Sequence, residues 1–320
     1  MNAPAPPAPG ATTPPPPAQA NSPFASTSFL AWTFVLVWGT GYLASKAGLQ
    51  HVAPFTFLTL RFSFGLLVLL PLLLLAARRD PLRWPGDGKA WAHVVVAGLL
   101  MHAANLGGSH YAQYLGMSAG VTALVLATQP LATAFIAAAF MHERLRPFQW
   151  LGVFLGLVGV AFVVWHKIDV HAIHGDAVAA VLISLTAITA GTLYQRVFCP
   201  TVDLRTSTLI QFAASLLLLV PLAGAVEGFK ANLVPVVFAA VAFLVLFGSI
   251  FATNVLHTLM RRGEATRVTS LLYLTPIVAV LLEWLLFGVV PSILTVLGIA
   301  VTCAGVALVA WQPRRTERPA

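Results

Sequence analysis

The 320-residue sequence is 58% hydrophobic and only 9% charged, and its mean hydropathy is +0.87. Soluble globular chains carry roughly a quarter charged residues, so this composition excludes that class and predicts an integral membrane protein. The net charge of +8 does not indicate nucleic-acid binding, because most basic residues lie in short loops between apolar runs, where they set membrane orientation.

The N-terminal segment is rich in proline and contains no charged residue, so it cannot bury a core. We expect residues 1–26 to form a disordered cytoplasmic tail. A secretory signal peptide needs basic residues ahead of its apolar stretch, and this segment has none. The first apolar run is therefore predicted to be retained as a helix.

Ten apolar runs follow, each near or above the length that crosses the hydrocarbon core of a bilayer. Their ranges are 28–48, 55–77, 90–113, 120–140, 150–166, 176–197, 206–226, 235–258, 267–288 and 292–311. The sequence therefore predicts an all-α integral membrane protein with ten transmembrane helices.

Basic residues divide unequally between the two sets of loops. With the N-terminus in the cytoplasm, the inside loops and tails carry fourteen of the 18 Lys and Arg residues, and the outside loops carry only Lys167 and Lys230. This asymmetry predicts a multi-pass protein of the cell inner (plasma) membrane with cytoplasmic N- and C-termini, including a basic tail at residues 313–320.

An internal repeat relates the two halves of the chain. After a shift of 146 residues, Leu126, Pro130, Leu151, Gly152, Gly159, Val160, Ala161, Val163 and Trp165 fall on Leu272, Pro276, Leu297, Gly298, Gly305, Val306, Ala307, Val309 and Trp311. Each copy contains five predicted helices, over residues 27–167 and 175–312. Because five is odd, the second copy must enter the membrane upside down. Inverted repeats of this kind are common in secondary transporters that work by alternating access.

Three groups of residues stand in a fixed order along these runs. They are Trp38-Gly39-Thr40 with Lys46, Pro54 and Arg61; Gln129-Pro130 with Glu143 and Gly152; and Leu271–Pro276 with Trp284–Gly288 and Gly298. In order, spacing and two-repeat layout they resemble the drug/metabolite transporter (DMT) superfamily, specifically its EamA-like ten-helix exporters. The resemblance covers roughly residues 28–311. It implies export of amino acids or other small metabolites, often coupled to protons.

The sequence departs from the family pattern in one loop. The family usually has a glutamate after the loop glycine in both repeats, whereas here Glu143 stands in the first copy and Val289 occupies the matching place in the second. The two copies are therefore not expected to be functionally equivalent.

Charged residues inside apolar runs are expensive in a bilayer and usually face a bundle interior or a wet cavity. Arg61 and Glu283 lie at similar depth from the predicted outer surface, roughly 8–9 Å at 1.5 Å per residue. In one interpretation Arg61 binds a carboxylate and Glu283 takes an amine or a proton. In the other they form a structural ion pair or extend toward the surface. Lys46 either extends to the outer surface or lines the path.

The third predicted helix carries further polar side chains, at His102, Asn105, His110 and Tyr111. They are candidates either for hydrogen bonds that hold neighbouring helices together or for a substrate or proton path, and His110 and Tyr111 are the better path candidates. In the eighth helix Asn254 is a similar polar candidate.

Aromatic and polar residues of the first helix and prolines of the fourth and ninth complete the set of candidates. Trp38 and Tyr42 share one face of the first helix among small residues that permit close approach by a cargo or another helix. Gln129 is a further polar candidate. Pro130 and Pro276 lie in mid-helix at matching repeat positions, where each is predicted to kink its helix and act as a hinge.

Signatures of enzymes are missing from the sequence: it has no HExxH, GxSxG, CxxC, Walker or GxGxxG motif. We therefore expect no catalytic residue, cofactor or metal site. The predicted function is a secondary carrier that exports a small metabolite through the lipid bilayer, with protons as a possible coupling ion and a homodimer as a possible assembly. The alternatives are a facilitative channel or uniporter and, with less support, an intramembrane enzyme.

Overall fold

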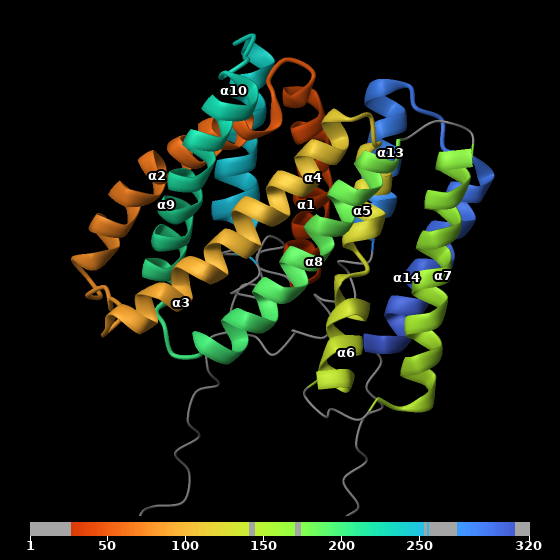
Figure 1. Ribbon diagram of the computed structural model, residues 1–320, viewed down its shortest axis with the longest axis horizontal. Coiled ribbons are helices and arrows are strands. Elements are labelled where there is room, and N and C mark those ends of the chain that lie inside the picture. Colours follow the sequence, from red (N-terminus) through yellow and green to blue (C-terminus); the bar gives the residue numbers. More distant parts are fainter. Residues whose placement is uncertain (1–26, 141–144, 170–173, 253–254, 256–273, 311–320) are drawn as a thin grey trace, which may run out of the picture.

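A computed structural model describes residues 27–140, 145–169, 174–252, 255 and 274–310 (Figure 1). Within these ranges the chain is helical and forms no strand, apart from one isolated antiparallel bridge between Val52 and Ala231. The described residues therefore have the all-α architecture that the sequence predicts.

The helices follow the predicted apolar runs closely, most of them within about three residues. The first half contains α1 (Thr27–Leu49), α2 (Pro54–Ala77), α3 (Gly88–Gly98), the π-helix η2 (Leu99–Ala104), α4 (Asn105–Tyr114), α5 (Ala119–Leu126), α6 (Gln129–Phe140) and α7 (Pro147–Asp169). The second half contains α8 (Gly175–Phe198), α9 (Leu204–Leu222), η3 (Ala223–Glu227), α10 (Pro235–Phe243), η4 (Leu244–Phe251), α13 (Thr275–Phe287) and α14 (Ile293–Ala310).

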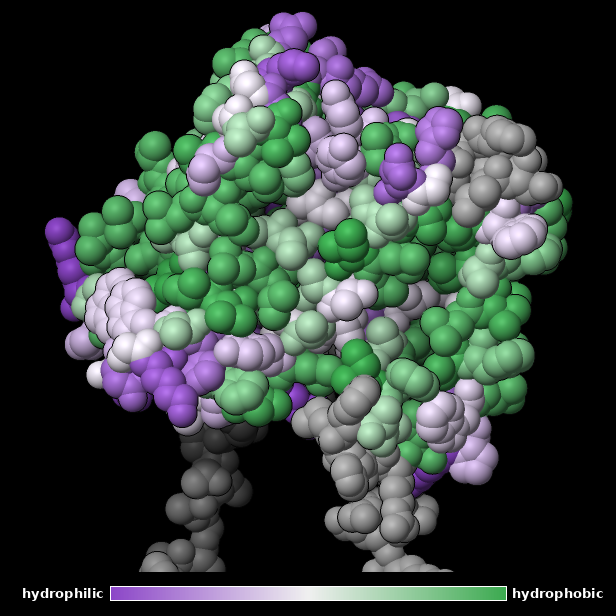
Figure 2. Space-filling view, viewed as in Figure 1, coloured by the Kyte–Doolittle hydropathy of each residue, from purple (hydrophilic) through white to green (hydrophobic). Residues whose placement is uncertain are grey.

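Large apolar side chains lie on the outside of the helices. Leu67, Trp165 and Leu217 are each more than 70% exposed to the surroundings of the protein. Figure 2 shows hydrophobic residues across the middle of the visible face and hydrophilic residues concentrated toward its upper and lower margins. Such a surface is stable where lipid replaces water. The protein is thus an all-α membrane protein.

Six segments are long and apolar enough to cross a bilayer, and they include α2, the continuous α3–η2–α4 and α9–η3. The apolar helices α10–η4, α13 and α14 are shorter, and α1 is 23 residues long. Because residues 253–254 and 256–273 lie outside the described ranges, the count of ten spans remains a prediction.

Helices α7 and α14 pack closely along rows of glycines, side by side in Figure 1. A Cβ atom at Gly152 would lie 2.5 Å from the carbonyl oxygen of Gly305, and one at Gly298 would lie 3.0 Å from that of Gly159. The 146-residue repeat equates Gly152 with Gly298 and Gly159 with Gly305. The two contacts are therefore exchanged by a two-fold axis across an antiparallel helix pair, which is the packing of inverted repeats.

The prolines of the repeat lie in the first turns of their helices. A turn at residues 127–128 separates α5 from α6, and Pro130 is the second residue of α6. Pro276 is likewise the second residue of α13. Proline lacks an amide hydrogen and fits the first turn, where no intrahelical partner is needed. The interruption at Pro130 agrees with the expected bend, whereas the residues just before 274 lie outside the described ranges, so the kink at Pro276 and both hinge roles stay predictions.

A second pair of irregularities occupies equivalent positions in the third helix of each half. The π-helix η2 covers Leu99–Ala104, and a shift of 146 residues places it within η4, Leu244–Phe251. Insertions of π geometry into α-helices are frequent at functional sites. Each half thus has a π segment and a proline-initiated half-helix at matching places.

Candidate functional site

The helix bundle has two ends, the Leu49 end and the Arg78 end. The Leu49 end contains the end of α1, the starts of α2, α5 and α10, and the end of α13. The Arg78 end contains the end of α2, the start of α3, the end of α8 and the start of α9.

Glu283 forms a junction of three helices at the Leu49 end. Its carboxylate accepts hydrogen bonds from the backbone amides of Ala119 at 3.0 Å and Gly120 at 2.9 Å, the first residues of α5. Lys46 of α1 lies with its Nζ 2.5 Å from Glu283 Oε1 and 4.9 Å from the ring centre of Phe287. The Glu283 side chain is only 3% exposed. A buried carboxylate here gains both a counter-charge and the positive end of a helix dipole.

The structure identifies the ion-pair partner of Glu283, which the estimated depth of each residue in the membrane did not. Arg61 and Glu283 have similar depth, but Glu283 is paired with Lys46, and the described residues contain no ion pair between Glu283 and Arg61. The first-half residue equivalent to Glu283 under the repeat is Ala137. The junction at the Leu49 end therefore has no carboxylate counterpart at the equivalent position of the other half.

Glu227 forms a second carboxylate junction at the same end, which the sequence analysis missed. It accepts from the backbone amides of Phe55 and Thr56 and from the Thr56 hydroxyl, each at 2.8 Å, and is 7% exposed. Glu227 thereby satisfies orphan amides of the α2 N-terminus. An acid directly at the end of an apolar run is the sequence signal that identifies it in retrospect.

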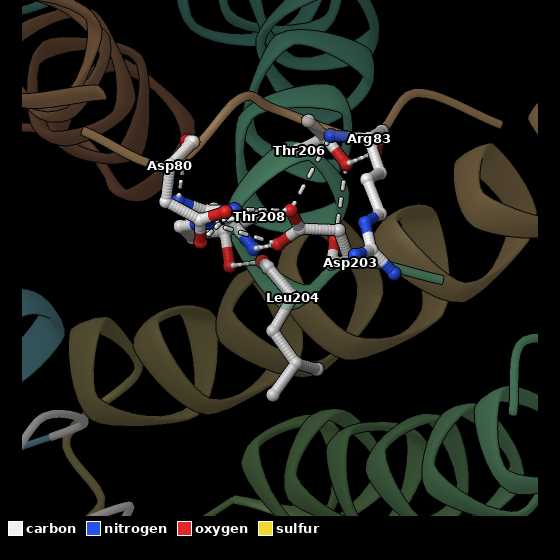
Figure 3. A network of polar contacts seen from close by, with 7 residues as sticks. Asp80, Arg83, Asp203, Leu204, Thr206 and Thr208 are labelled. Carbon is white, nitrogen blue, oxygen red and sulfur yellow. Dashed lines mark hydrogen bonds and ion pairs between the residues drawn. The ribbon is translucent and has the colours of Figure 1, made fainter. Parts of the chain in front are cut away.

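The Arg78 end holds a related polar network between the α2–α3 and α8–α9 connections (Figure 3). Arg205 Nη2 lies 3.1 Å from Asp80 Oδ2 and 2.8 Å from Asp203 Oδ2. Thr206, the third residue of α9, donates to the Arg83 carbonyl oxygen at 2.8 Å, as Thr56, the third residue of α2, donates to Glu227. The paired helices α2 and α9 are thus fastened at both ends.

Asp203 at this network is predicted to make stability depend on acid pH. Hydrogen bonds from Arg205 lower the pKa of Asp203 below its usual value of 3.8. Its contribution is therefore present above pH ~4 and lost as the pH falls through the lower folded-state pKa. We expect Asp203→Asn, which keeps the helix cap, to lower stability by up to ~1 kcal/mol at neutral pH.

Melting temperatures of the purified wild type and Asp203→Asn between pH 7 and pH 3 test this prediction. The difference should shrink below pH 4. A difference that stays constant across this range would contradict it.

Arg61 lies in α2 beside the third segment of the first half. Phe57, one turn before it, contacts the His110 ring with centroids 5.8 Å apart, and Phe62, just after it, contacts His102 at 5.9 Å. The structure thus brings Arg61, His102 and His110 together, from three of the predicted positions.

Among the described residues, some polar side chains of the α3–η2–α4 segment form hydrogen bonds to neighbouring helices, whereas others do not. His102 Nε2 lies 3.1 Å from Gln211 Oε1 of α9, and Asn105 accepts from Ser184 of α8 at 2.8 Å. These two bind neighbouring helices. His110 Nε2 is buried without a hydrogen-bond partner among the described residues, and Tyr111 stacks on Phe55 with centroids 5.9 Å apart.

The aromatic pair of α1 lies beside the same helices. Tyr42 packs against the buried alanines Ala119, Ala123 and Ala279 of α5 and α13, near the Glu283 junction. Trp38 interacts with Tyr42 and is 39% exposed. A Cβ atom at Gly39 would lie 2.7 Å from Val278 Cγ1, so the small residue serves close approach of α13 to α1.

Gln129 at the start of α6 donates to the Thr192 hydroxyl of α8 at 3.0 Å, directly beside the break between α5 and α6. At the corresponding start of α13, the buried Thr275 hydroxyl has no hydrogen-bond partner within the described ranges. Asn254 and Glu143 lie outside the described residues, and their predicted roles stay predictions.

Comparison with known proteins now gives the family. Residues 25–165 and 176–311 match the model of the EamA-like transporter family. The chain is 30% identical over 273 residues to the "Uncharacterized inner membrane transporter YedA" of Escherichia coli strain K12, covering 80% of this chain and 85% of that protein. It is 26% identical over 303 residues to the "Probable amino-acid metabolite efflux pump" of Salmonella typhimurium strain LT2, covering 91% and 97%.

A crystal structure at 21% identity superposes with a TM-score of 0.62 over 89% of this chain and 96% of that one, which shows a shared fold. The family match spans both halves of the chain, in agreement with the resemblance of its motifs. The chain belongs to the EamA-like transporter family and is a membrane transporter.

Proposed function

We propose that the protein is a secondary carrier that exports a small polar or amphipathic metabolite by alternating access, without chemical change of the cargo. The observation that carries this proposal is the pairing of irregular segments. Both halves contain a π segment and a proline-initiated half-helix at equivalent positions, and inverted halves with interrupted helices can exchange conformations to open a central path alternately.

The proposed path runs between α1, α2, α4, the α5–α6 break and α13. Trp38, Tyr42, Arg61, His110, Tyr111 and Glu283 are its proposed principal residues. His102, Asn105, Lys46 and Gln129 are proposed to hold the surrounding helices through the contacts described above. In this proposal the Glu283 junction opens during each cycle, because α1, α5 and α13 must separate there to release cargo.

The proposed orientation places both termini in the cytoplasm and the Leu49 end outside. This is supported by the excess of Lys and Arg in the loops of the opposite side. The proposed repeat units are residues 27–167 and 175–312. Proton coupling and a homodimer belong to the same proposal and are open to direct measurement.

Reconstitution tests the carrier against a pore. Purified protein in proteoliposomes should show saturable flux and counterflow of an exported metabolite, identified by comparing medium from cells with and without the protein. Flux that never saturates and shows no counterflow would favour a facilitative channel, and a chemically altered cargo would favour an enzyme.

Pro130→Ala is predicted to slow transport without unfolding the protein. Alanine restores an amide hydrogen, so α5 and α6 can join into one helix across residues 127–128, which removes the break. We expect a roughly tenfold lower rate, corresponding to about 1.4 kcal/mol in the barrier. Pro71→Ala is the matched control, because Pro71 lies inside the uninterrupted helix α2. Equal rates for wild type and Pro130→Ala would contradict a role for the break.

A further inference from the structure

Arg61 is a cation inside the membrane with no counter-charge in the described part of the chain. It lies seven residues after the first residue of α2, roughly 10 Å along the helix at 1.5 Å per residue. The ion pairs among the described residues are those of Lys46 with Glu283 and of Arg205 with Asp80 and Asp203, and no hydrogen bond joins Arg61 to another described residue. A guanidinium is always charged and has five donors, so it calls for an anion that the described residues do not supply.

Two unsatisfied acceptors lie on the neighbouring helix α4. His110 and Gln113 are 3% and 8% exposed, and His110 Nε2 and Gln113 Oε1 have no hydrogen-bond partner in the part of the chain that the structure describes. Ser109 Oγ donates to the Leu106 carbonyl oxygen at 3.2 Å and lies 3.3 Å from His110 Nδ1. That network assigns the imidazole proton to Nδ1, which leaves a lone pair on Nε2. Both orphan atoms therefore need a donor.

Helices α2 and α4 lie side by side near His110. Phe55 stacks on Tyr111 and Phe57 contacts His110, so the first turns of α2 run along α4. Arg61 follows Phe57 by one turn and therefore shares its helix face. Within the described ranges, the unpaired guanidinium of Arg61 and the two acceptors without donors, His110 Nε2 and Gln113 Oε1, thus come from neighbouring turns of α2 and α4.

We infer that Arg61, His110 and Gln113 form a recognition site for a ligand that combines a carboxylate with a nearby N–H group. The carboxylate pairs with Arg61, and the N–H group donates to His110 Nε2 and Gln113 Oε1. A simple anion leaves both acceptors unsatisfied, and a simple cation is repelled by Arg61. This inference rests on the proposed function, since the ligand is the transported metabolite. Glu283 already accepts hydrogen bonds from Lys46 and from the amides of Ala119 and Gly120. The inference therefore assigns amine recognition to α4 and not to Glu283.

The test uses the compounds that accumulate in the medium of cells expressing the protein. Each compound is compared with its primary amide, which lacks the carboxylate, and with its N,N,N-trimethyl form, which lacks N–H donors, as competitors of transport. The wild type should bind both analogues at least about tenfold more weakly, the scale of one charge-assisted hydrogen bond. Arg61→Gln should abolish the preference for acid over amide, and Gln113→Leu the preference for N–H over trimethyl.

Stability separates this role from a structural one. Arg61→Gln should raise the melting temperature of the free protein, because it removes a half-buried charge that has no counter-charge among the described residues, and ligand should no longer stabilise the variant. Arg79→Gln, an exposed arginine at the end of α2, is the control and should change neither property.

Three results would overturn the inference: exported compounds without an anionic group, an acid preference that survives in Arg61→Gln, or a lower melting temperature for that variant. A protein that exports nothing would instead refute the proposed function, and this inference with it. The identity of the exported compounds therefore distinguishes the two failures.

Discussion

Replacing Glu283 by alanine should destabilise the protein by about 3–5 kcal/mol, the usual effect of removing one partner of a buried ion pair. The change leaves Lys46 without its counter-charge and the amides of Ala119 and Gly120 without acceptors. Three helices lose their shared contact at once. Denaturant titration of the purified protein in mixed micelles measures the loss.

Graded variants identify the source of this loss. Glu283→Gln keeps an acceptor for the α5 amides and should be milder than Glu283→Ala. Lys46→Met should be milder still, because the α5 N-terminus continues to stabilise the carboxylate. The double variant Lys46→Met/Glu283→Gln should be more stable than the two single effects predict, since neither buried charge remains. Additive effects of the two changes would contradict a direct pair.

Gly305→Ala should destabilise the protein by about 2–3 kcal/mol through overpacking of α7 against α14. The added Cβ would lie 2.5 Å from both the Gly152 carbonyl oxygen and the Gly156 amide nitrogen, and backbone atoms cannot rotate away. The loss should appear in the same denaturant titration.

The two-fold axis that relates α7 to α14 extends this prediction to a second glycine. Gly159 is the repeat equivalent of Gly305, and a Cβ there would lie 2.5 Å from Thr302 Oγ1 and 2.9 Å from the Gly298 oxygen. Gly159→Ala should therefore have a similar effect. Gly248→Ala is the control, because no atom of the described residues lies within 4 Å of its added Cβ and its φ is not positive. Stable Gly305→Ala and Gly159→Ala variants would contradict close packing at this interface.

Hydropathy and repeat analysis predicted most of the helices because a lipid-facing helix must be apolar over its whole length. The run 55–77 became Pro54–Ala77, and 176–197 became Gly175–Phe198. The repeat analysis matched Gly152 with Gly298 and Gly159 with Gly305 but did not predict that these glycines meet between α7 and α14, a contact that the structure reveals.

Interruptions of the helix inside transmembrane segments were harder to predict from the sequence. Pro130 was expected in the middle of one helix, but residues 127–128 end α5 and Gln129 begins α6. The π segments η2 and η4 carry no proline and no glycine pair that marks them. Their geometry depends on how neighbouring helices pack, which hydropathy does not report.

The ion-pair and hydrogen-bond partners of the charged residues could not be predicted from the sequence, for a related reason. Residue counting gives depth along a helix but not direction around the bundle. Arg61 and Glu283 share a depth, yet Glu283 pairs with Lys46, and no ion pair joins Glu283 to Arg61 among the described residues. Glu227 went unnoticed because an acid at a span boundary resembles an ordinary solvated residue until its acceptor role toward α2 is seen.

Alternating access is tested most directly by linking α5 to α13 at the Leu49 end. Ala123 and Ala279 are buried in one cluster, and cysteines at these positions can be joined by a short bifunctional thiol reagent in a protein whose Cys199 and Cys303 are replaced by alanine. Transport in proteoliposomes should stop when the link forms, persist in both single-cysteine variants, and return when a cleavable link is cut. Undiminished counterflow through fully linked protein would contradict the account.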